Sequence, residues 1–144
     1  MTLTLQNYTD TKSYLFNTTD NFERQKNYNL IIASLPKGSA DKAVINSLLG
    51  VESTIIITFE ITPRTDDYTV GTGTMPTDND IDEEANWLMD TICVSSSKVY
   101  KIIRTRDSQT WTGTLADISI PEIGDQPNKM VCRLVFKIGV IPTL

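Results

Sequence analysis

Apolar and polar residues alternate along several long stretches of this chain. In the clearest of them, residues 130–140, apolar side chains occupy every second position: Met130, Cys132, Leu134, Phe136, Ile138 and Val140. Because successive side chains of a β-strand point to opposite faces, this spacing predicts a long strand with one dry face. Such a strand needs partners along its whole length, and we expect them at residues 53–62, 98–105 and 110–120.

Two of the expected partners carry distinct signals of their own. Residues 53–62 are rich in β-branched side chains and place three isoleucines and a phenylalanine on one face before Pro63 ends the strand. In residues 110–120 the apolar positions change from odd to even numbers after Leu115. That change of phase predicts a β-bulge or a strong twist.

Residues 80–94 have the spacing of an amphipathic helix. Asp80 can cap it, and Glu83, three places later, can complete a capping box. One apolar stripe follows at intervals of three and four: Ile81, Ala85, Leu88, Met89 and Ile92. We expect this to be the principal helix of the chain, with that stripe buried.

Residues 28–50 predict a strand and a shorter helix. The strand covers residues 28–35 and ends at Pro36. In residues 43–50 apolar side chains recur at helical spacing, and Gly50 is a natural helix stop. One or two helical turns are therefore predicted there.

Two polar segments show no sustained period. Residues 1–27 are expected to form an N-terminal arm, with a short strand possible at Leu3 and Leu5; the arm is either loosely ordered or docked on a neighbouring subunit through its aromatic residues. Residues 63–79 are expected to form an extended loop, and a loop of that length is usually functional or disordered. The chain as a whole, 1–144, is expected to be a single mainly β domain with one principal helix, of the α+β class.

The charge and the length of apolar runs argue against two classes of protein, those that bind nucleic acid and those that insert into membranes. The net charge is −5, from 18 acidic and 13 basic residues, which argues against a protein that grips nucleic acid. No apolar run approaches the roughly 20 residues that span a bilayer, so no membrane insertion is expected. Cys93 and Cys132 lie in apolar settings and are interpreted as buried free thiols.

Few residues of the chain are suited to catalysis or metal binding. The chain has no histidine, which removes Ser-His-Asp and Cys-His catalysis and imidazole metal ligation. Residues 78–82 match the first ligand positions of a calcium loop, but Glu83 stands where that loop needs glycine and Met89 where it needs a bidentate glutamate. We therefore expect no enzyme activity, no metal site and no cofactor.

The order of elements after residue 48 carries a resemblance. A short apolar segment ends in glycine, and a long β-branched strand, an extended loop and an acidic-start helix with Asn86-Trp87-Leu88 follow. A hairpin with Trp111-Thr112-Gly113, a turn at Gly124-Asp125 and the final strand complete the series. In this order residues 48–144 resemble the tail tube proteins of tailed viruses, whose fold is shared by the tubes of contractile injection systems.

The resemblance implies an antiparallel β-sandwich or barrel of tail-tube type that closes into a β-barrel on ring assembly. It implies a homo-oligomer of stacked rings, usually six-fold, around a channel for DNA passage. The protein would be assembled in the host cytoplasm, would reside in the virion tail and would have other tail proteins as partners. Two alternatives stay open: another ring-forming tail component, such as a tail terminator or baseplate ring, and a monomeric β-sandwich module whose 63–79 loop grips a ligand.

Two groups of site residues follow from these expectations. The polar faces of the two long strands are candidates for the channel wall or, on the simpler interpretation, a solvated sheet face: Thr54, Thr58, Glu60, Arg133 and Lys137. A conduit must avoid holding phosphates, so Arg133 and Lys137 are expected either to pair with Glu60 across the sheet or to lie outward. Candidates for contact between rings come from the extended loop: Asp66, Asp67, Tyr68, Gly71 and Gly73.

Overall fold

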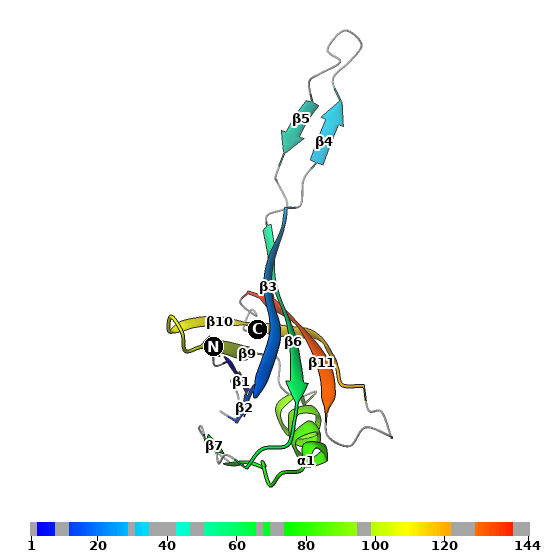
Figure 1. Ribbon diagram of the computed structural model, residues 1–144. Coiled ribbons are helices and arrows are strands. Elements are labelled where there is room, and N and C mark those ends of the chain that lie inside the picture. Colours follow the sequence, from blue (N-terminus) through cyan, green and yellow to red (C-terminus); the bar gives the residue numbers. More distant parts are fainter. Residues whose placement is uncertain are drawn as a thin grey trace.

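A computed structural model of the chain describes residues 3–7, 12–28, 31–34, 43–46, 51–65, 68–69, 74–94, 99–121 and 129–139. Its main element is a seven-stranded sheet in which all neighbouring strands are antiparallel (Figure 1). The order across the sheet is β2 (Ser13–Leu15), β1 (Leu3–Asn7), β9 (Tyr100–Arg104), β10 (Gln109–Ser119), β11 (Met130–Ile138), β6 (Val51–Ile61) and β3 (Thr18–Tyr28). The fold is therefore mainly β with one principal helix, as predicted.

Strand β11 pairs with β6 on one side and β10 on the other. Its register against β6 runs from Met130↔Ile61 to Ile138↔Ser53. The register against β10 shifts between Leu115 and Asp117, which confirms the predicted bulge. Strand β9, the third expected partner, pairs instead with β10 and β1, so that part of the prediction was wrong.

The helix begins after Asp80, whose carboxylate accepts hydrogen bonds from the backbone N–H groups of Asp82 and Glu83. An α-helical part, α1 (Ile81–Asn86), continues as a π-helical part, η1 (Trp87–Ile92). Ile81, Ala85, Leu88 and Ile92 are buried as predicted, but Met89 is 39% exposed. The change to i→i+5 hydrogen bonds rotates the later residues relative to the earlier ones, and Met89 leaves the stripe.

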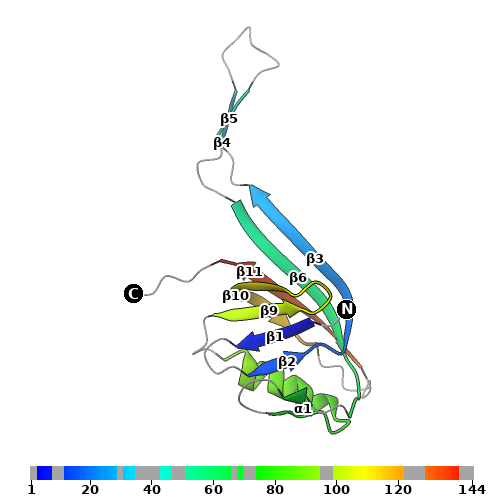
Figure 2. The ribbon, with the colours of Figure 1, turned by 90° about the vertical axis from the view of Figure 1, so that its left-hand side faces the viewer.

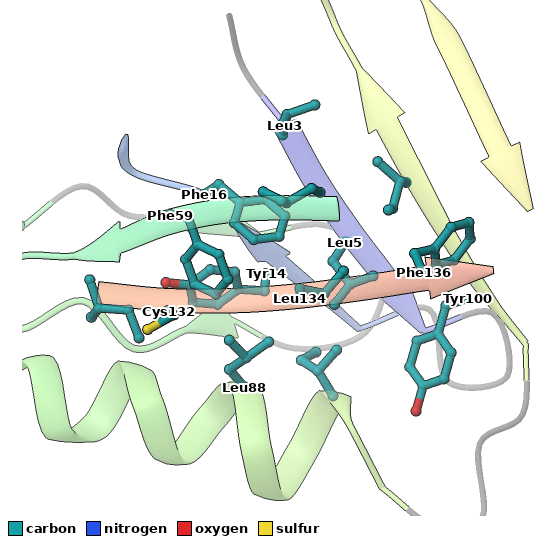
Figure 3. Close-up of a cluster of buried hydrophobic side chains, with 14 of the residues drawn as sticks. Leu3, Leu5, Tyr14, Phe16, Phe59, Leu88, Tyr100, Cys132, Leu134 and Phe136 are labelled. Carbon is teal, nitrogen blue, oxygen red and sulfur yellow. The ribbon is translucent and has the colours of Figure 1, made fainter. Parts of the chain in front are cut away.

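The core lies between the curled sheet and the helix. Leu88 points from the helix toward Cys132 and Leu134 on β11 (Figure 3). The sheet curls far enough that Phe16, next to β2, meets Phe59 of β6 edge to face at a ring separation of 4.7 Å. Both cysteines are free, and burial raises the pKa of each thiol to about 12.

Residues 43–50, expected as a helix, form a strand where they are described. Strand β5 (Ala43–Asn46) pairs with β4 (Ile31–Ser34) in a separate hairpin. A short apolar run fits either period, and here its β-branched positions Val44 and Ile45 are in register with Ala33 and Ile32 of the other strand. The hairpin lies beyond the ends of β3 and β6, at the end of the molecule opposite the helix (Figures 1 and 2).

The described parts of residues 1–27 contain more strands than the short one expected at Leu3 and Leu5, and two short strands lie within residues 63–79. In place of a loosely ordered arm, residues 3–28 supply β1, β2 and β3, and β3 follows β6 along its length. Strand β3 shows no apolar period because it is an edge strand with most side chains exposed. Within residues 63–79, β7 (Tyr68–Thr69) pairs with β8 (Thr74–Met75), and a bridge joins Arg64 to Asp78.

Candidate assembly surfaces

The predicted channel-wall residues lie on one face of two neighbouring strands. Arg133 is directly opposite Thr58, and Lys137 is directly opposite Thr54. Glu60 is opposite Val131, one register pair further along the same face. The alternate residues of these strands, such as Phe59 and Leu134, point into the core beside the helix (Figure 3). The five candidates therefore share the sheet face turned away from the helix, which we call the open face.

Charge pairing on the open face differs from expectation. The Glu60 carboxylate pairs with Lys129, with 2.7 Å between Nζ and Oε1, and this hydrogen bond raises the pKa of Lys129. Lys137 donates instead to the Thr54 hydroxyl at 3.0 Å, and Thr54 is only 3% exposed. The expected partnership of Glu60 with Arg133 or Lys137 was therefore wrong, because Lys129 sits closer to the end of β6 that carries Glu60.

Neighbouring strands extend the open face with further carboxylates. Glu23 of β3 is opposite Ile56, and Asp117 of β10 is opposite Val135. Val131 on the same face is an apolar residue with 47% of its surface exposed. The open face thus combines carboxylates, two cations and exposed aliphatic side chains.

Of the predicted contacts between rings, the structure describes only Tyr68. It begins β7 and pairs with Met75 of β8. Asp66, Asp67, Gly71 and Gly73 lie outside the described residues. Their expected role stays a prediction.

A buried ion pair that the sequence did not reveal fastens the start of residues 63–79. Arg64 donates from Nε to Glu84 of α1, and its Nη2 donates to the backbone carbonyl of Leu15. The guanidinium also lies over the Tyr14 ring, 5.6 Å from its centroid. Among 18 acidic and 13 basic residues, no sequence signal distinguishes this pair.

The environment of Glu84 explains why that pair matters. Its side chain is 1% exposed, and burial raises its pKa, while the hydrogen bond and charge of Arg64 act in the opposite direction. Burial also raises the pKa of Tyr14. Since an isolated buried carboxylate is costly, Arg64 and Glu84 depend on each other.

The paired strands β3 and β6, which we call the ribbon, extend past the core. On the core-side face of β6, Ile57 and Ile55 are fully buried, whereas Val51 is 50% exposed. Its partner Tyr28 is 60% exposed. One face of the ribbon is therefore buried in the core near Ile57 and exposed near Val51.

A hollow of about 610 Å³ lies where the ribbon leaves the core, and we call it the basic hollow. It is lined by Arg24, Gln25, Lys26, Ser53, Thr54, Trp111 and Ile138. Trp111 has the Arg104 guanidinium 4.9 Å and the Arg24 guanidinium 5.7 Å from its ring centroid, geometry suited to cation–π attraction. The sequence did not reveal this site because β3 carries no periodic pattern.

Comparison with known proteins gives a result at the level of the fold. No known protein family and no curated protein matches the chain. Among solved structures, the chain is similar to a chain in the tail of an empty GTA (gene transfer agent) particle, determined with C6 symmetry. The identity is 11%, the match covers 97% of this chain and 92% of that one, and the TM-score is 0.53.

This chain has a phage tail-type fold. A second match, to a chain in the six-fold symmetrised baseplate of the anti-feeding prophage, has 8% identity, covers 96% of this chain and 88% of that one, and has a TM-score of 0.47. The match to the particle-tail chain confirms the expected mainly β fold of tail-tube type, and closure into a β-barrel on ring assembly stays a prediction. Within the described residues, no helix is long and apolar enough to cross a membrane, and no group of His, Cys, Asp and Glu could hold a metal ion.

Proposed function

We propose that this chain is a structural subunit of a virus tail tube, without catalytic activity, which associates into six-fold rings that stack around a channel for DNA. The observation that carries the proposal is the match of nearly the whole chain to a chain in a C6-symmetric particle tail. The subunit would be assembled in the host cytoplasm, would reside in the virion tail and would contact other tail proteins. The uncovered end of the ribbon supports the proposal, because neighbouring exposed apolar side chains such as Tyr28 and Val51 are typical of a surface that a partner covers.

The sheet edges suggest how a ring could close. One edge is β2, with 3 residues, and the other is β3, with 11 residues. A long edge strand is a template for pairing with another chain, and closure into a barrel removes such edges. Strand β3 also carries charges and a bulge between Thr19 and Asn21, which oppose indiscriminate pairing. A neighbouring copy would therefore need a matching register and charge pattern.

The open face is the proposed channel wall. Thr58, Glu60, Arg133 and Lys137 would face a passing duplex, with Thr54 buried beneath Lys137. A wall that neutralised many phosphates would hold DNA in a salt-dependent manner. Carboxylates on the same face, including Glu23 and Asp117, offset the cations and reduce that grip.

Residues 63–79 are the proposed contact with the next ring, through Asp66, Asp67, Tyr68, Gly71 and Gly73. The buried Arg64–Glu84 pair supports this role, because it fixes the base of the segment to the helix. A contact segment with a fixed base loses less conformational freedom on docking than a free loop. Deletion of residues 66–77 should stop tube growth and leave rings; unchanged growth would contradict the role.

Light scattering and negative-stain electron microscopy of the purified protein over a concentration series test the proposed function. Six-membered rings and tubes are expected. Single rings that never stack would indicate a tail terminator or baseplate ring. A strictly monomeric particle at high concentration and varied salt would contradict assembly and favour the ligand-binding module.

Labelling of Thr58→Cys in assembled tubes tests the channel wall. A small thiol reagent should reach the new cysteine through the channel, whereas a bulky reagent should be excluded. The unassembled subunit provides the control, because both reagents should label it there. Equal and rapid labelling of assembled tubes by both reagents would place the residue on the outside.

A further inference from the structure

Unpaired positive charge gathers at the basic hollow. Arg24 and Lys26 are exposed, and within the described residues neither forms an ion pair with a carboxylate. Both lie on the same face of β3 as Tyr28, because side chains two residues apart share a face. The hollow therefore presents two cations without a carboxylate partner among the described residues and the Trp111 ring, and the exposed Tyr28 lies two residues further along β3.

Unpaired negative charge gathers at the opposite end of the molecule. Asp78, Asp80, Asp82 and Glu83 are all exposed at the beginning of α1, and we call them the acidic helix start. Asp80 caps the helix, whereas Asp82 and Glu83 form no ion pair within the described part of the chain. The helix lies at the end away from the β4–β5 hairpin, and the ribbon leads toward that hairpin (Figures 1 and 2).

We infer that the basic hollow receives the acidic helix start of a second copy of this chain in the adjacent ring. The inference rests on the proposed function, and it names the partner surfaces that join one ring to the next. A contact between two different surfaces of identical subunits propagates head to tail when it does not close, which is the geometry of a growing tube. Opposite charges at the two ends fix the direction of stacking, because like ends repel.

The occupant is a second copy of the chain because the two surfaces of the same molecule carry opposite charges. The hollow offers Arg24 and Lys26, and the helix start offers Asp82 and Glu83 without internal partners. Tyr28 and Val51 beside the hollow would lose their exposed apolar surface in the same contact. A passing duplex would also bring negative charge, so DNA is the competing occupant in the test.

Charge reversal and restoration provide the test. We compare the wild-type chain with R24E/K26E, with D82K/E83K and with the chain that carries all four substitutions. Each double variant should form rings that do not stack, and pelleted tube should fall by about tenfold or more because every lost contact repeats around the ring. The fourfold variant should recover tube growth. The variant R24K/K26R keeps the charge and should stack like the wild type.

Different outcomes separate the inference from the proposed function. Tubes of normal length from R24E/K26E, or failure of the fourfold variant to stack although its rings and circular dichroism are normal, would overturn the inference alone. Absence of rings from the wild-type chain would overturn both. Duplex DNA binding by wild-type subunits that R24E/K26E abolishes, measured by fluorescence anisotropy, would overturn the inference in favour of a nucleic-acid site.

Discussion

The two halves of β6 make a useful comparison. In its second half, the core-side residues Ile55, Ile57 and Phe59 are fully buried. Its first half continues the same hydrogen-bonded pairing with β3 but ends at Val51, which is half exposed. The same backbone pairing thus serves the core in one half of the strand, and we propose that the other half offers a surface to a neighbouring subunit.

The largest expected loss of stability comes from the core that covers the second half of β6. Leu88→Asp places a charge at a fully buried position beside β11 and should cost more than about 4 kcal/mol, enough to prevent folding. Met89→Asp is the matched control, because Met89 is 39% exposed and its substitution should cost within about 0.5 kcal/mol. Urea denaturation measures both. Similar midpoints for the two variants would contradict the helix packing.

Arg64→Met comes next, because it leaves Glu84 buried without its partner. A loss of about 3–5 kcal/mol is expected for removal of one member of such a buried pair. The double variant Arg64→Met/Glu84→Leu should be more stable than Arg64→Met alone, since it removes both charges. Urea midpoints of the single and double variants give the coupling, and a double variant less stable than the single one would show that the pair is not the cause.

A smaller loss of stability is expected at the ion pair of Arg104, which lies over side chains of β3 and β10. Arg104 lies over Phe22 and Trp111 and forms a two-point ion pair with Asp107, which lowers the pKa of Asp107 from 3.8 to about 2. The stabilisation is fully present above pH 3.8 and is lost as the pH falls through about 2. Asp107→Asn should therefore lower the melting temperature at pH 5 and match the wild type near pH 2. A constant difference across that range would point to the turn geometry instead.

The smallest effect on the free energy of unfolding is expected at the exposed start of β6. Val51→Ser should change the free energy of unfolding by no more than about 0.5 kcal/mol, because Val51 is already half exposed. Ile55→Ser, on the same face of the same strand but fully buried, should cost about 2 kcal/mol or more. Light scattering should show weaker association for Val51→Ser. Equal loss of stability in both variants would remove the distinction between the halves.

Periodicity predicted the covered part of the molecule well. Strands β6 and β11, the bulge after Leu115 and the helix start at Asp80 follow from patterns that burial imposes. Strand β3 and the basic hollow could not be found this way, since an edge strand with most side chains exposed carries no apolar period. The Arg64–Glu84 pair was also hidden, because spatial proximity between residues 20 apart leaves no local signal.

The position of β1 in the sheet has a consequence for synthesis. Leu3 pairs with Arg104, and β1 lies between β2 and β9, so β1 cannot be placed in the sheet until β9 has left the ribosome. Strand β6 likewise waits for β11, near the other end of the chain. Sheets whose neighbouring strands are far apart in sequence fold slowly. The chain loses the entropy of closing a long loop before the stabilising contacts between the strands can form. The sheet should therefore be completed only after β11 has left the ribosome.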